Sequence, residues 1–233
     1  MKKILLVSLV MLLAVSVAFS QFGIKGGVNL GTFGGADSKQ TIEINPSVPP
    51  IEMTPKSKTG LAAGISYKIN LILGLSIQPE VIYVQKGAIY ETGSVDISLF
   101  GAPAGSVGSL KMTTTLDYID IPVLVKFSLP VPVLSPYIEG GVSYGILLSA
   151  KEKSDTSATI TGQGNYNGSG EKDIKSDLPK NDLSILVGVG FELFILDINA
   201  RYVMGITKLA KDFNGNDLKV YNRGIMLTAG LRF

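Results

Sequence analysis

The chain has 233 residues, with 21 lysine and arginine residues against 19 aspartate and glutamate residues, and it contains neither histidine nor cysteine. The absence of histidine excludes a Ser-His-Asp triad, imidazole proton transfer and most transition-metal sites, and the absence of cysteine excludes disulfides and thiolate chemistry. Two of the basic residues lie among the first 20, which leaves 19 charges of each sign in the remaining chain. This balance, without a cluster of basic residues, excludes a nucleic-acid partner.

The start of the chain has the pattern of a secretory signal peptide. Lys2 and Lys3 precede an apolar run that ends in Ala18-Phe19-Ser20. The run is shorter than the roughly 20 residues that a membrane-spanning helix needs, which favours cleavage after this triplet over a retained anchor helix. We expect residues 1–20 to be a signal peptide and residues 21–233 to form one domain.

Apolar residues alternate with polar or small residues over long stretches of the remaining chain. The mean hydropathy is +0.33, yet no segment after the signal peptide has 18 consecutive apolar residues. A membrane can then be crossed only by a closed barrel, in which residues facing lipid alternate with residues facing the interior. In the first such stretch Phe22, Ile24 and Val28 share one face, and Lys25 and Asn29 share the other.

The alternation predicts an all-β fold, an eight-stranded antiparallel up-and-down transmembrane β-barrel. In chain order the predicted strands cover residues 22–33, 59–69, 73–90, 113–129, 136–148, 183–193, 196–206 and 221–233. Pro79 interrupts the third strand, and because proline has no backbone N–H we expect a bend there. Alternation alone does not separate a membrane barrel from a soluble sheet with one buried face.

The lengths of the connections favour the membrane barrel. Four connections are long and polar, and the three between them have only a few residues each; the long ones cover residues 34–58, 91–112, 149–182 and 207–220. Because long and short connections alternate strictly, all long loops lie at one rim, which matches short periplasmic turns and long extracellular loops. The last strand ends on Phe233, and its pairing with the first strand would close the barrel and hold this residue in place.

The face opposite the apolar one carries five positive and five negative side chains. An eight-stranded barrel is just wide enough for side chains to fill its interior, so charges that face inward must pair or contact water. We therefore expect a filled interior with a structural ion-pair network of Lys25, Lys68, Glu80, Asp120, Lys126, Glu139, Glu192, Asp197, Arg201 and Arg232. A carboxylate pair such as Glu80 and Asp120 is the remaining candidate for acid–base chemistry, but the balance of charges favours a structural role.

Two further motifs lack the features that their chemistry needs. Residues 212–217 resemble a calcium loop, but glycine occupies the fourth position instead of the sixth and no glutamate closes the loop, so we interpret this segment as a turn. The glycine-rich segment 162–170 is not followed by the helix that a phosphate-binding loop requires, and we expect an external loop there. No cofactor or metal site is predicted.

Short motifs occur in an order that is typical of one family. They are Gly26-Gly27 with Asn29, Gln78-Pro79-Glu80, Asp120-Ile121-Pro122, Tyr137-Ile138-Glu139 and the final Phe233. Through these motifs the chain resembles the PorT-like family of outer-membrane β-barrel proteins over essentially its whole mature length. It differs at Asp120, where the family commonly has glutamate before the Ile-Pro pair. The resemblance implies an integral outer-membrane barrel of a Gram-negative envelope, and the eponymous member is tied to protein secretion across that envelope.

These observations predict a non-enzymatic protein of the outer membrane whose external loops serve surface contact or an envelope or secretion accessory role. The expected partners are outer-membrane lipid, the barrel assembly machinery, and an extracellular or envelope protein bound through the loops. Phe233 resembles the aromatic signal that this machinery reads at the last strand. Two alternatives stay open: a narrow solute channel, and a secreted lipocalin-like ligand binder, which requires an apolar interior and a polar exterior.

Overall fold

The computed structural model of the protein describes residues 21–42, 50–98, 101–129, 131, 133–211 and 217–233. The predicted signal peptide, residues 1–20, lies outside the described residues, as do residues 212–216 of the predicted turn. No helix within the described ranges is long and apolar enough to cross a membrane.

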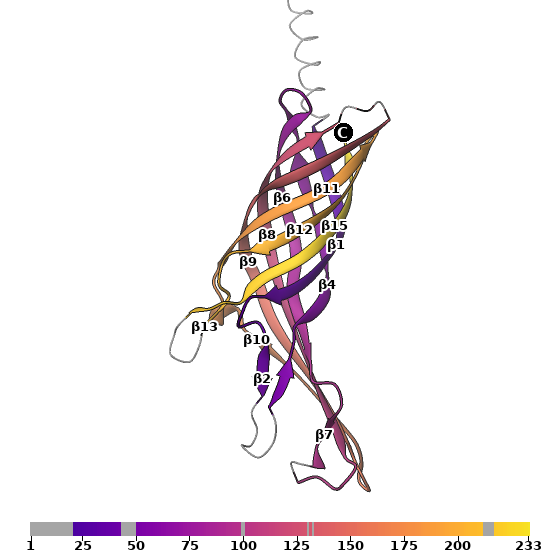
Figure 1. Ribbon diagram of the computed structural model, residues 1–233, viewed down its shortest axis with the longest axis vertical. Coiled ribbons are helices and arrows are strands. Elements are labelled where there is room, and N and C mark those ends of the chain that lie inside the picture. Colours follow the sequence, from indigo (N-terminus) through magenta and orange to yellow (C-terminus); the bar gives the residue numbers. More distant parts are fainter. Residues whose placement is uncertain (1–20, 43–49, 99–100, 130, 132, 212–216) are drawn as a thin grey trace, which may run out of the picture.

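Eight antiparallel strands form a closed barrel (Figure 1). In chain order they are β1 (Phe22–Gly34), β4 (Lys56–Tyr67), β6 (Leu75–Glu91), β8 (Val107–Ser128), β9 (Leu134–Ile160), β11 (Asn181–Leu193), β12 (Leu196–Gly205) and β15 (Tyr221–Arg232). Each pairs with the next along the chain, and β15 pairs with β1 from Gly23 opposite Arg232 to Gly34 opposite Tyr221, which completes the ring. The predicted eight-stranded up-and-down transmembrane barrel is confirmed, with shifted strand ends.

The strands form because each carries apolar side chains on one face. On β1, Ile24 is 45% exposed on the outer wall, whereas Lys25 is buried in the interior at 7%. The same alternation recurs around the ring, and the exposed apolar side chains of the wall include Leu61, Val81, Val123, Val125, Ile138, Val142, Val187, Val189 and Leu227. Apolar surface in water costs about 25 cal/mol per Å², so this wall is suited to contact with lipid.

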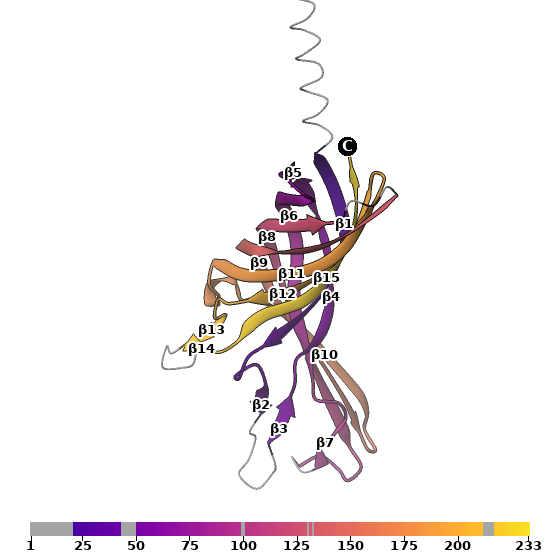
Figure 2. The ribbon, with the colours of Figure 1, turned by 45° about the horizontal axis from the view of Figure 1, so that its top comes forward.

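The two rims of the barrel differ, as the connection lengths predict. The connections 71–74 and 194–195 are short, and they lie at the rim where the chain ends (Figure 1). Leu73 and Phe194 have φ values of 52° and 53°, the left-handed region that tight turns often use. The long connections lie at the opposite rim (Figure 2) and include two small hairpins, β2 (Gln40–Ile42) with β3 (Ile51–Met53) and β13 (Ala210–Lys211) with β14 (Asp217–Leu218).

Beyond the long-loop rim, β8 and β9 extend out of the barrel and form a narrow sheet with two further strands. β8 has 22 residues and β9 has 27, and their outer parts pair with each other. β9 also pairs with β10 (Gly164–Asp173), and β8 also pairs with β7 (Val95–Asp96). This sheet projects well past the barrel in both ribbon views (Figures 1 and 2). We call it the blade, defined as β7, β10 and the outer parts of β8 and β9, residues 107–115 and 150–160.

The blade corrects the sequence prediction. Polar loops are predicted over residues 91–112 and 149–182, including an external loop at 162–170, but much of these segments is strand. All ten residues of β10 are exposed, and polar cross-strand pairs occur between β8 and β9, such as the Ser109 and Ser157 hydroxyls at 2.8 Å. A strand with two polar faces shows no apolar alternation, which is why the pattern does not identify it.

Pro79, where we predict a bend, lies within β6, and the pairing of β6 has gaps beside it. The register between β6 and β8 does not shift around Pro79, which pairs with Val123. The pairing with β8 is nevertheless interrupted at Glu80 and Val81. On the other side β4 ends at Tyr67, and pairing with β6 resumes at β5 (Ile69–Asn70). Proline cannot donate to the ladder, and the gap between β4 and β5 accommodates the missing hydrogen bond.

Candidate functional site

The barrel interior holds two clusters of charged side chains. The first is centred on Arg201 of β12, whose guanidinium lies between the carboxylates of Glu80 on β6 and Glu139 on β9. Arg201 Nη1 and Nη2 donate to Glu80 at 2.5 and 2.8 Å, and Arg201 Nε donates to Glu139. All three side chains have no exposed surface. The forked donors of a guanidinium suit this bridging of two carboxylates.

Lys25 of β1 and Gln78 of β6 complete the surroundings of Glu80. Lys25 Nζ donates to Glu80 Oε1 at 2.6 Å, and Gln78 Nε2 donates to the same oxygen at 2.5 Å. The carboxylate of Glu80 thus accepts hydrogen bonds from side chains on three strands. Burying a carboxylate is costly unless it is paired and hydrogen-bonded, and these donors meet that requirement.

The first cluster continues toward the short-turn rim. Lys126 Nζ lies 3.2 Å from Asp197 Oδ2, and Arg232 Nη2 donates to the same oxygen at 2.8 Å. Arg232 Nη1 also lies 2.6 Å from Glu192, which Lys68 Nζ contacts at 2.9 Å. The side chain of Lys126 has no exposed surface, whereas those of Lys68, Arg232 and Glu192 are 11–16% exposed. Water therefore reaches only the outer part of this cluster.

The second cluster surrounds Lys86 of β6. Lys86 Nζ lies 2.9 Å from Asp120 Oδ2 and 3.1 Å from Asp182 Oδ2, and 4.5 Å from the centroid of the Tyr118 ring. Asn222 Nδ2 donates to the same oxygen of Asp182 at 2.9 Å. One lysine thus contacts two buried carboxylates, from β8 and β11.

The ten charged residues predicted to face inward all lie in these clusters, nine in the first and Asp120 in the second. The sequence prediction omits Lys86 and Asp182. Both could have been found from the alternation, because residues an even number of positions apart on a strand share a face. Lys86 follows Glu80 by six positions on β6, and Asp182 precedes inward-facing Ser184 by two on β11. Asp182 is omitted because the predicted sixth strand begins one residue after it.

The clusters close the lumen. The side chains of Lys126, Arg201 and Glu139 have no surface accessible to water, whereas an open channel at this level would expose them. Glu80 and Asp120, the carboxylate pair considered for acid–base chemistry, lie in different clusters, and each is bound by a cation. No group of three or more potential metal ligands is assembled within the part of the chain that the structure describes. This arrangement is suited to stabilising and filling the barrel.

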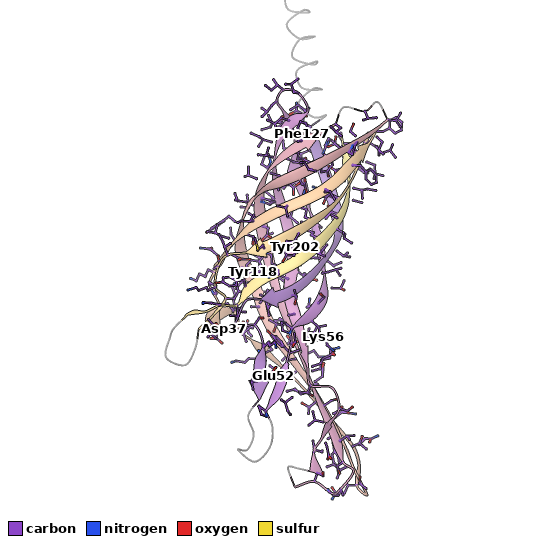
Figure 3. The ribbon with its side chains drawn as sticks, in the orientation of Figure 1. Asp37, Glu52, Lys56, Tyr118, Phe127 and Tyr202 are labelled. Carbon is purple, nitrogen blue, oxygen red and sulfur yellow. The ribbon has the colours of Figure 1, made fainter. Side chains whose placement is uncertain are left out.

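The outer wall of the barrel is apolar, and its interior is charged. Phe127 is 45% exposed on the outer wall near the short-turn end, whereas Asp37, Glu52 and Lys56 lie toward the long-loop end (Figure 3). A lipocalin-like binder needs the reverse arrangement, an apolar interior and a polar exterior. The lipocalin-like alternative therefore does not fit this structure.

Comparisons with known proteins give one family and a set of solved structures. Residues 16–211 match a family model described as outer membrane protein beta-barrel domain. Neisserial surface protein A (NspA) is 13% identical, with 91% of this chain and 97% of that chain covered and a TM-score of 0.41. Ail, the attachment invasion locus protein of Yersinia pestis, is 15% identical, with the same coverage and a TM-score of 0.34. The translocator domain of the autotransporter NalP from Neisseria meningitidis is 13% identical, with 94% and 92% covered and a TM-score of 0.26. No curated protein matches the sequence.

Proposed function

The chain belongs to the family of the outer membrane protein beta-barrel domain. On this premise we propose that it is a non-enzymatic protein that acts through its external loops. The observation that carries the proposal is the filled lumen, in which Glu80, Glu139 and Arg201 are fully buried. Because the wall faces lipid and ion pairs close the lumen, the long-loop rim and the blade are the surfaces that can contact other molecules.

The blade supports a role in surface contact. All ten residues of β10 are exposed, and β10 is the last strand of its sheet, so its outer edge is available within the described structure. The blade also extends past the rim, where a partner outside the cell would meet it before the barrel. We further propose the narrower PorT-like assignment, with an envelope or secretion accessory role, which is supported by the order of the short motifs in the sequence.

Two proposals concern export and assembly. We propose that residues 1–20 are a signal peptide cleaved after Ser20, so that the mature protein begins at Gln21, directly before β1. We also propose that the barrel assembly machinery reads Phe233. The Phe233 side chain is 54% exposed, and its backbone N–H donates to the Phe22 carbonyl oxygen at 2.8 Å, which holds the ring at the seam between β15 and β1.

Single-cysteine labelling tests whether the blade is displayed outside the cell. The chain has no cysteine, so Asn167→Cys in β10 and Ile195→Cys at the short-turn rim each introduce one thiol at an exposed position. A membrane-impermeant maleimide should label Asn167→Cys but not Ile195→Cys in intact cells, and both variants after lysis. Labelling of Ile195→Cys alone in intact cells would contradict the proposal.

Planar-bilayer recording separates the filled barrel from the narrow channel. The purified protein should give no steady conductance, because Lys126 and Arg201 block the lumen with side chains that water does not reach. The recording is made on protein whose folded state is verified by heat-modifiable migration on a gel. A large, steady conductance would overturn the filled interior and establish the channel instead.

A further inference from the structure

A cavity of about 290 Å³ lies at the mouth of the barrel, at the long-loop rim. Its walls are inward-facing residues at the outer ends of four barrel strands, among them Phe33 of β1, Tyr90 of β6, Leu116 of β8 and Glu152 of β9. Three of the long connections cover it with both apolar and polar side chains. The cavity is therefore built jointly by the barrel and its loops.

The apolar part of the cavity is preformed. Leu116 has no exposed surface, and it belongs to a buried cluster against which Ile174 and Leu178 of a covering connection pack. The Tyr90 hydroxyl donates to the Ser38 carbonyl oxygen at 2.8 Å. This bond fixes the Tyr90 ring. Pockets that bind small molecules share this character of largely apolar walls with a few placed polar groups.

The charge of the cavity is unbalanced. Glu152 is half-buried and lies close enough to Tyr90 for an electrostatic interaction, but among the described residues its carboxylate has no ion-pair partner. Asp37, at the rim of the cavity, likewise has none within the described ranges. The one lysine of the lining, Lys39, lies 3.6 Å from Glu52. Lys172 lies opposite Glu152 in the β9–β10 pairing, but its ammonium group lies 3.8 Å from Asp177. Within the described ranges, Glu152 and Asp37 thus have no ion-pair partner.

We propose that the mouth cavity binds a small organic cation, an ammonium group carrying a short apolar portion. The walls around Leu116 would bury the hydrocarbon, and the Glu152 carboxylate would accept a charge-assisted hydrogen bond from the ammonium group or lie against a quaternary one. The rings of Phe33 and Tyr90, whose centroids lie 6.4 Å apart, offer faces that attract a cation. A neutral ligand would leave Glu152 unpaired, and an anion would be repelled. Glu152 lies where β9 leaves the barrel and enters the blade, but the proposed binding does not require the surface-contact role of the blade.

Three probes of matched size test the charge preference: 2-phenylethylammonium, 2-phenylethanol and phenylacetate. Their binding to the purified, folded protein is measured by calorimetric titration. The ammonium probe should bind about tenfold more tightly than the alcohol, which corresponds to about 1.4 kcal/mol, and phenylacetate should not bind measurably. Equal affinities for the three probes, or preference for phenylacetate, would overturn the proposal.

A pair of variants assigns the effect to Glu152. Glu152→Gln should weaken 2-phenylethylammonium binding about tenfold while leaving 2-phenylethanol binding unchanged, which also verifies that the cavity is intact. The matched control is Glu171→Gln on β10, where the carboxylate pairs with Lys151 at 2.7 Å and is 54% exposed; this variant should bind both probes as the unmodified protein does. Unchanged ammonium binding by Glu152→Gln would show that the cavity does not use this carboxylate and would refute the site.

Discussion

Replacing Arg201 with methionine is expected to lower the free energy of unfolding of the barrel by about 3–5 kcal/mol. The substitution removes the guanidinium between Glu80 and Glu139, whose side chains have no exposed surface, and leaves both carboxylates buried. Lys25 still lies 2.6 Å from Glu80, but the nearest remaining cation to Glu139 is Lys126 at 3.8 Å. Urea unfolding in lipid vesicles, followed by heat-modifiable migration on a gel, measures the loss.

Two controls test whether the loss of unfolding free energy in Arg201→Met arises from the burial of the ion pairs. Lys151→Met removes one partner of an ion pair with Glu171 whose side chains are both more than half exposed, and it should cost only about 0–1 kcal/mol. The double variant Arg201→Met/Glu139→Gln should be more stable than Arg201→Met alone, because it removes the carboxylate that has lost its partner. If Arg201→Met costs no more than Lys151→Met, the buried cluster does not stabilise the barrel.

The variant Phe233→Ala is expected to reduce the amount of folded protein in the outer membrane several-fold, whereas Phe33→Ala should change it little. Phe233→Ala retains the backbone hydrogen bond to Phe22 and the pairing of β15 with β1, so it removes only an exposed ring. Phe33 is also at the seam, but its ring faces the mouth and packs near Tyr90. Immunoblotting of the membrane fraction, with and without heating, measures folded protein.

Refolding without cells separates an assembly signal from a stabilising contact. In detergent, where no assembly machinery is present, Phe233→Ala and the unmodified protein should fold to the same extent. A shared defect in cells and in detergent would mean that Phe233 acts through stability alone. Equal membrane yields of Phe233→Ala and Phe33→Ala would also argue against the signal.

The barrel could be predicted because its strands experience two different environments. Lipid on one side and packed side chains on the other impose a strict alternation, as in Leu183, Ile185 and Val187 against Ser184 and Leu186. The same period assigns charged side chains to the interior. Which charges meet could not be predicted, because Arg201 and Glu80 are 121 residues apart and their contact depends on the tilt and register of the closed ring.

The blade and the mouth cavity lack a comparable signal. β10 contains three glycines and otherwise polar or aromatic residues, a composition that is typical of loops, and it becomes a strand only through pairing with β9. The cavity depends on isolated apolar residues within polar connections, such as Ile174, Leu178 and Leu209. These residues have no periodic relation to one another, so only the folded chain places them around one space.

The ion pairs of the lumen also bear on how the barrel reaches its final state. Lys68 and Glu192 are 124 residues apart, and Arg201 and Glu80 are 121 apart, so these contacts join distant parts of the chain across the interior. A partly assembled sheet would hold the same charges without partners and would be high in free energy. Closure is therefore cooperative: the network forms as a unit, when the first and last strands meet. Once formed, it opposes the loss of any single strand, because detaching one strand would leave unpaired charges on several others.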